Sequence, residues 1–181
     1  MSATIFLDRS RYYLATEYPS KIRLAVAKLS HEEVWRRAND QSNSIGNLIV
    51  HLAGNIRHWI VAGIGGATSN RDRAAEFAMR GGPDADELLA LLDAAIRDAD
   101  EVIVAQTDAD LIRECEIQGR NTTVLAAIYH VVEHFSMHTG QIVMLAKIYS
   151  PGSVRFYGDD PAGKAAPLWG GAEGIEGDKK P

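Results

Sequence analysis

The chain has 181 residues, a hydrophobic fraction of 46% and a net charge of -5 at pH 7. This length suits one domain with its own core, and the negative charge disfavours a nucleic-acid partner, which favours a clustered basic face. No apolar stretch is long enough to span a bilayer, so we expect no membrane partner. The single cysteine, Cys115, excludes an internal disulfide. Together with a start that lacks signal-peptide features, it predicts a cytoplasmic protein.

The first long helix is predicted over residues 5–29, where apolar residues recur at helical spacing. Pro19 interrupts this pattern, because proline lacks a backbone N–H and its ring crowds the preceding turn. We therefore expect the helix to kink or restart there. Ser30 and Glu33 have the spacing of a capping box, which predicts that a short helix follows.

Two further long helices are predicted in the middle of the chain. Residues 43–62 carry one apolar stripe at helical spacing and end at Gly63. A polar connection leads to Pro83 and Asp84, which open the next helix because proline suits a first turn and aspartate caps it. Residues 111–118 alternate in polarity, so we expect a strand or an extended connection.

The last long helix is predicted over residues 122–149, with Asn121 or Thr122 as its cap. Four long helices with almost no strand predict an all-α protein, a four-helix bundle that occupies residues 1–150. Residues 151–181 hold four of the six prolines and seven of the sixteen glycines. We expect this tail to pack on the bundle as loop or to be partly disordered.

Five of the six histidines lie on two of the predicted helices. His130, His134 and His138 follow one another at intervals of four residues, which places successive side chains about 40° apart around the helix and about 6 Å apart along it. Two imidazoles at this spacing converge on one ion, as in zinc-binding helices. His138 and His134 point closer to the apolar side of the helix than His130 does, so we predict that they form the chelating pair.

A metal site in a bundle usually draws ligands from more than one helix. His51 is the best candidate on a second helix because it flanks the apolar stripe, and His58, two turns further along, is the alternative. We therefore predict a site formed by His51, His134 and His138, with His130 facing solvent or lying outside the ligand set. The competing interpretation is that these histidines are packed, hydrogen-bonded side chains without a metal.

The segments that carry the histidines, residues 42–60 and 126–147, resemble the DinB-like superfamily, which includes the YfiT-type proteins. Looser similarity covers residues 71–77 and the dipeptide Tyr18-Pro19. The resemblance is closest to a branch whose members have no assigned function. It implies a four-helix bundle of up-down-down-up topology that holds a divalent transition metal.

The resemblance also implies the ligands. It places them at a histidine of the second helix and at a His-x-x-x-His pair that precedes Gly-Gln in the fourth helix. In this sequence the ligands are His51, His134 and His138, and the dipeptide is Gly140-Gln141. The helical spacing and the resemblance therefore select the same pair on the last helix.

Three neutral imidazoles leave a divalent ion its full charge and at least one open position. An open site acidifies a bound water or thiol and polarises a carbonyl, and zinc, nickel, iron, copper and manganese are all candidates for it. The superfamily includes transferases and isomerases that act with low-molecular-weight thiols. The resemblance thus implies a small-molecule substrate and an external thiol as cosubstrate, because Cys115 lies away from the histidine motifs. Thr139 stands where many relatives carry arginine, which puts in doubt a substrate contact at that position.

Two other functions fit the same residues, a non-enzymatic metal-binding stress-response protein and a metal-dependent hydrolase. Several side chains are further candidates to orient the imidazoles: Asn47, Asn55, Glu133 and Gln141. The connection after the second helix holds arginines that either bind an anionic substrate or stay solvated: Arg71, Arg73 and Arg80. The tail holds aromatic residues that either cover the site or pack on the bundle: Phe156, Tyr157 and Trp169.

A homodimer is also expected. Bundles of the family that the sequence resembles often pair. In addition, Tyr12 and Leu14 of the first helix lie about 160° apart on a helical wheel, so that helix is apolar on two sides. A dimer interface would bury the second side.

Overall fold

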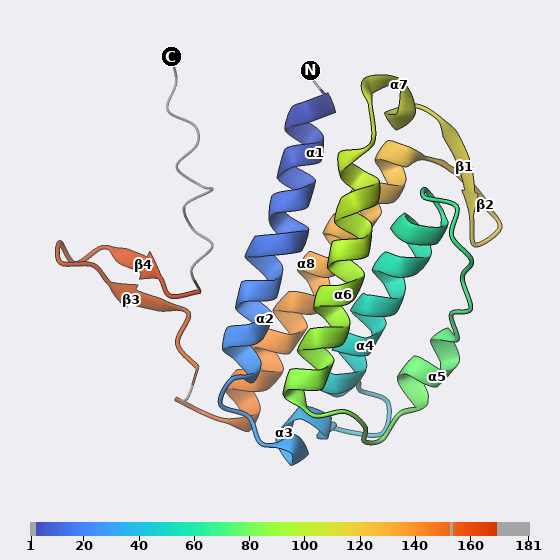
Figure 1. Ribbon diagram of the computed structural model, residues 1–181. Coiled ribbons are helices and arrows are strands. Elements are labelled where there is room, and N and C mark those ends of the chain that lie inside the picture. The colour runs from blue at the N-terminus through green and yellow to red at the C-terminus, as the bar shows by residue number, and fades with distance from the viewer. Residues whose placement is uncertain (1–2, 153, 170–181) are drawn as a thin grey trace.

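Four long helical segments lie side by side in the computed structural model, which describes residues 3–152 and 154–169 (Figure 1). The first segment consists of α1 (Ala3–Tyr12), the π-helical turn η1 (Tyr13–Glu17) and α2 (Tyr18–Val26). The other three are α4 (Ile45–Ile56) continued by η2 (Arg57–Ala62), α6 (Ala85–Val104) and α8 (Val124–Tyr149). The first and last segments run in one direction and the middle two in the other. The predicted all-α bundle of up-down-down-up topology is therefore confirmed.

The irregularity predicted at Pro19 is a π-helical turn directly before it. The N–H of Tyr18 bonds to the carbonyl of Tyr13, five residues earlier, and α2 continues through Pro19. The wider turn makes room for the proline ring, so the helix continues instead of breaking. After it, Ser30 and Glu33 form the predicted capping box at the start of α3 (His31–Trp35).

The two middle helices begin at side-chain caps. Ser44 caps α4, and Asp84 caps α6 in a capping box with Glu87. Pro83 therefore precedes the cap and lies outside the first turn in which we expected it. Nearly every residue of α4 is buried, because this helix packs against both α6 and α8. The largest fully buried side chains of the core are Leu14, Ile22, Ile45, Leu48, Ile49, Leu52, Ile56, Ile60, Leu88, Leu92, Ile103 and Phe135.

The connections that follow η2 contain short elements, of which the sequence predicted only the strand or extended connection at residues 111–118. The segment between η2 and α6, treated above as a polar connection, contains α5 (Arg73–Ala78), and α7 (Asp108–Leu111) follows α6. Next comes an antiparallel hairpin of β1 (Glu114–Ile117) and β2 (Arg120–Thr123). Its turn residues, Gln118 and Gly119, have φ angles of 56° and 70°, as a type I′ turn requires. Asn121 and Thr122 lie in β2, so the cap of α8 is Thr123 and not either predicted residue.

The described part of the tail packs on the bundle. It forms a second hairpin, β3 (Tyr157–Asp159) with β4 (Ala165–Pro167), between Phe156 and Trp169, which are both buried. The indole N–H of Trp169 donates to the carboxylate of Glu17 at 3.0 Å and so fastens the hairpin to the first helical segment. Residues 170–181 of the predicted tail lie outside the described residues. Among the described helices, none combines the length and apolar character that crossing a membrane requires.

Candidate metal centre

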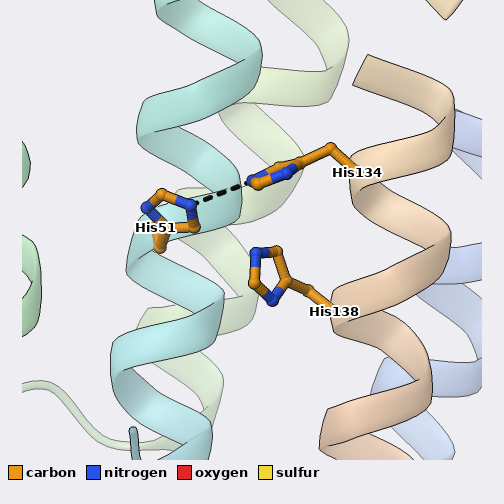
Figure 2. A group of neighbouring side chains, drawn as sticks. All are labelled: His51, His134 and His138. Atoms are coloured by element: carbon orange, nitrogen blue, oxygen red, sulfur yellow. Dashed lines mark hydrogen bonds between the residues drawn. The ribbon is translucent and has the colours of Figure 1, made fainter. Parts of the chain in front are cut away.

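Three of the histidines converge between α4 and α8. Figure 2 shows His51 on α4 facing His134 and His138 on α8. The Nε2 atoms of His51 and His134 are 2.9 Å apart, and the three side chains each offer a nitrogen within 4.8 Å of the others. In a tetrahedral zinc site, Zn–N bonds of about 2.0–2.1 Å place ligand nitrogens roughly 3.4 Å apart. The structure thus brings together the three side chains predicted from the sequence, at separations that suit one ion.

The site lies at the edge of the core. His51 and His138 are buried, whereas His134 is only half-buried. The rings of His134 and His138 lie with centroids 4.4 Å apart and planes at 86°, so the i,i+4 pair presents two separate lone-pair directions. A centre that is buried on one side and reachable on the other still admits a small molecule.

The protonation states suit metal binding, which requires neutral imidazoles. Burial, reinforced by the neighbouring His138 and His51, lowers the pKa of His134 to about 3. Burial also lowers the pKa of His138, against the opposing effect of its hydrogen bond with Gln141. At neutral pH both rings therefore carry a free lone pair.

A buried carboxylate orients His51. Oε2 of Glu76, a residue of α5, lies 2.8 Å from Nδ1 of His51. Arg71 binds the same carboxylate in a bidentate manner, with Nε at 2.6 Å from Oε1 and Nη2 at 2.8 Å from Oε2. Burial alone would raise the pKa of Glu76, but hydrogen bonds from Arg71 and His51 outweigh it and hold the pKa below its ordinary value. The ionised Glu76 is an acceptor for a proton on Nδ1 of His51, and the tautomer that carries this proton presents Nε2 to the site.

The pair of Arg71 and Glu76 was not predicted from the sequence. We expected Arg71 either to bind an anionic substrate or to stay solvated, yet the side chains of Arg71 and Glu76 are each 8% exposed and form an ion pair. Gly54 of α4 leaves the space they occupy, because a Cβ there would collide with Oε1 of Glu76. Asn47 donates through Nδ2 to the backbone carbonyls of Glu76 and Met79, at 2.9 and 3.1 Å, and so holds α5 against α4. Asn47 thus positions α5 and does not contact the histidines as we had expected.

Of the other predicted orienting residues, only Gln141 contacts a ligand candidate. Its Oε1 lies 2.6 Å from Nδ1 of His138 and accepts that proton, which leaves Nε2 for the site. Glu133 is exposed on α8. Asn55 is buried and its Oδ1 has no hydrogen-bond partner among the described residues. The structure gives no account of Asn55.

His58, the alternative ligand, and His130, which was predicted to lie outside the ligand set, are both outside the cluster. His58 places Nδ1 2.7 Å from the hydroxyl of Ser69. His130 packs on the ring of Trp59 with centroids 4.2 Å apart, and its centroid is 5.5 Å from that of His134. Neither belongs to the group of converging nitrogens.

The donor set fits a divalent transition metal. Nε2 of His138 is buried and has no hydrogen-bond partner among the described residues, although an unsatisfied buried nitrogen normally costs about 1–3 kcal/mol. Nε2 of His51 and Nε2 of His134 lie at a distance at which two imidazole nitrogens share either a proton or a cation. Three nitrogen ligands leave an open position on a four-coordinate ion.

Comparison with known proteins gives a family. The family described as "Protein of unknown function (DUF1572)" matches residues 2–156, which is most of the chain. The chain belongs to this family. A DinB-like protein from Bacillus subtilis, known from a crystal structure, has a similar fold, with a TM-score of 0.61 at 18% sequence identity. That match covers 82% of this chain and 96% of the other, and at this identity it shows the fold alone. The resemblance to DinB-like proteins is thereby confirmed for the fold. A comparison with curated proteins gives no match.

We expect the metal-free protein to lose stability as the pH falls from about 6.5 toward 3. The pKa of His134 is about 3 in the folded protein, and it is about 6.5 in an unfolded chain. Between these values the unfolded chain binds more protons, so the free energy of unfolding decreases with falling pH and is fully retained only above about 6.5.

Urea unfolding of the metal-free protein, prepared with a chelator, measures the free energy of unfolding at several pH values. Carboxylates also titrate in this range, so the comparison is with a His134→Gln variant, which lacks the titrating ring. A wild-type protein with the same pH dependence as His134→Gln would contradict the expectation.

Proposed function

We propose that the protein binds one divalent transition metal through His51, His134 and His138, and that it is a metal-dependent enzyme acting with a low-molecular-weight thiol, as an S-transferase or an isomerase. The observation that carries the proposal is the convergence of three imidazoles, two of which are oriented by Glu76 and Gln141. Structural metal sites usually have four protein ligands, whereas a site with three retains an open position for a substrate.

A bound divalent ion would supply a Lewis acid that lowers the pKa of a thiol in the open position. The protein's part is to hold the imidazoles in place. Glu76 fixes the ring of His51, and Gln141 fixes that of His138. Pre-oriented ligands need no rearrangement on binding, which favours reactivity over mere storage of the ion.

The reacting thiol is proposed to be external. Cys115 lies on β1, at the end of the bundle near α7, whereas the histidines lie along the middle of α4 and α8 (Figure 1). Burial raises the pKa of the Cys115 thiol, which disfavours the reactive thiolate. A small thiol from solution can reach the histidines, and a bound metal would favour its thiolate form.

A cavity that borders Gln141, although none of the three histidines lines it, offers room for the organic part of a substrate. It has a volume of about 340 Å³ and lies between the beginning of α4 and the end of α8. Gln141, which contacts His138, also forms part of its wall. Leu48, Leu145 and Met144 make the wall largely apolar. These contacts support a small substrate with an apolar portion. Thr139 lies outside this cavity, so a contact there is not part of the proposal.

We expect turnover only when both metal and thiol are present. The test uses protein purified without a nickel column, whose metal content is measured first, because a tag column can load the site artificially. Thiols resembling glutathione, bacillithiol and mycothiol are then screened against haloaromatic and epoxide electrophiles, and thiol consumption is followed. Metal removal is expected to slow the reaction by about 100-fold or more.

The other outcomes of this screen separate the alternatives. Equal rates with and without metal would contradict the proposed enzyme. Hydrolysis of a substrate without a thiol would indicate a metal-dependent hydrolase. Stoichiometric metal with no turnover of any substrate would favour a non-enzymatic metal-binding protein.

We also propose a homodimer, but on a different face from the one considered in the sequence analysis. Leu14 is buried in the core and the hydroxyl of Tyr12 donates to Glu17, so the first helix does not provide two exposed apolar sides. Exposed apolar residues instead gather on α8, where Leu125, Tyr129 and Met137 lie outside the proposed substrate cavity. Exposed apolar surface of this kind is typical of an interface.

Light scattering at micromolar concentration tests this proposal. A dimer has twice the 19.7 kDa mass of the chain. A Leu125→Asp, Tyr129→Asp variant is expected to be a monomer, because burying two carboxylates would oppose association. A wild-type mass of 19.7 kDa, that of a monomer, would contradict the proposed dimer.

A further inference from the structure

A separate cavity lies on the side of α8 that faces α2. It has a volume of about 320 Å³, and none of the three converging histidines lines it. The hairpin β3–β4, which Figure 1 shows beside α2, contributes to its wall. The wall is unusually rich in aromatic side chains: Tyr18, Phe156, Tyr157 and Trp169.

The aromatic wall is held in place by buried hydrogen bonds. Glu17 is 3% exposed and accepts from the indole N–H of Trp169 at 3.0 Å. It also pairs with Lys21, whose Nζ lies 2.7 Å from Oε1 of Glu17 and 4.5 Å from the centre of the Trp169 ring. The charge of Lys21 is thereby compensated. The cavity is thus largely preformed, which reduces the entropic cost of binding a ligand.

Two polar groups of the wall have neither a hydrogen bond nor an ion pair with the described residues. The ammonium group of Lys147 lies 5.3 Å from the centre of the Phe156 ring and forms no ion pair within the described parts of the chain. Thr139 is 3% exposed, and its hydroxyl has no hydrogen-bond partner among the described residues. A buried hydroxyl without a partner is costly and is usually satisfied by a water or a ligand.

The α8 side of the cavity is open at Gly140. A Cβ built on this residue would meet no other atom within 4 Å, although Gly140 lies in the cavity wall. Neither packing nor a positive φ angle requires glycine at this position. Its absent side chain therefore leaves room for a bound molecule.

We propose that this cavity binds a small aromatic carboxylate. The ring would lie against the aromatic wall, where ring–ring contacts add to the burial of apolar surface. The carboxylate would pair with Lys147, the one cation of the wall that the described protein does not neutralise, and charge-assisted hydrogen bonds of this kind are the stronger ones. The Thr139 hydroxyl supplies a further donor. Few polar groups in an otherwise apolar cavity are typical of small-molecule sites.

Calorimetric titration of the full chain with phenylacetate tests the proposal. We expect a Kd below about 1 mM, consistent with a ligand of this size. Two analogues separate the contribution of the carboxylate from that of the aromatic ring. 2-Phenylethanol lacks the charge and hexanoate lacks the ring, and each is expected to bind about tenfold more weakly. The same titration of a His134→Ala variant should give the wild-type Kd, because this site does not depend on the histidine cluster.

Two variants locate the binding. Lys147→Ala should weaken phenylacetate binding about tenfold, whereas Lys28→Ala, an exposed lysine outside the cavity, should leave it unchanged. Gly140→Leu should abolish binding because its side chain fills the cavity. Lys147 is exposed, so its variant remains informative even if Gly140→Leu does not fold. Absence of phenylacetate binding, equal binding of either analogue, or binding that Lys147→Ala leaves unchanged would each overturn the proposal.

Discussion

Replacing His134 or His138 by alanine is expected to abolish stoichiometric metal binding, and so is replacing His51. Each change removes one of three nitrogens that converge within 4.8 Å, and two remaining imidazoles chelate too weakly to hold an ion through purification. Elemental analysis of protein prepared without a nickel column should find about one ion per wild-type chain and less than about 0.1 per variant chain.

Matched histidine variants serve as controls. His31 is exposed on α3, and His58 bonds to Ser69 outside the cluster, so alanine at either position should leave the metal content unchanged. His130→Ala should also retain the metal, because the ring packs on Trp59 and offers no converging nitrogen. If the His134→Ala and His138→Ala proteins both keep their full metal content, the ligand assignment is wrong.

The sequence was sufficient to predict the two histidines of α8 because their geometry is local. Four-residue spacing brings His134 and His138 together on any α-helix, and the apolar stripe shows which side of the helix faces inward. His51 required a further assumption, that its helix packs against the last one. A bundle of four helices offers few such pairings, and the structure has this one.

The residues that orient His51 were missed because their relation is not local. Glu76 lies 25 positions after His51, in a helix of six residues that is too short to show a periodic pattern. An acidic residue in a polar segment normally indicates a solvated surface. Only the folded chain shows that Gly54 makes space for the carboxylate and that Arg71 compensates its charge.

The errors at helix starts have a similar cause. Thr123 rather than Thr122 caps α8, because the preceding residues pair in a hairpin that the weak Gln118-Gly119 turn signal did not indicate. Ser30 and Asp84 were predicted correctly because a capping box lies within four consecutive residues. The position of the tail depends on Glu17, whose partner Trp169 is 152 residues away.

The second large effect is expected at Glu76. Glu76→Ala removes the acceptor that fixes His51 and leaves the guanidinium of Arg71, whose side chain is 8% exposed, without its bidentate partner. A buried charge that loses its partner costs about 3–5 kcal/mol of folding free energy. Loss of a group that orients a metal ligand typically costs about 10–100-fold in metal affinity. The control is Glu133→Ala, which removes an exposed carboxylate on α8. It should change neither the folding free energy nor the metal affinity.

A double variant separates the two effects of Glu76. In Glu76→Leu, Arg71→Met the unpaired charge is gone, so urea unfolding of the metal-free protein should show stability close to that of the wild type, since apolar replacements of a buried ion pair are often neutral. The orientation of His51 is still lost. Competition with a chelator should therefore show the same 10–100-fold loss of metal affinity as Glu76→Ala. Wild-type metal affinity in the double variant would mean that Glu76 only neutralises Arg71 and does not position His51.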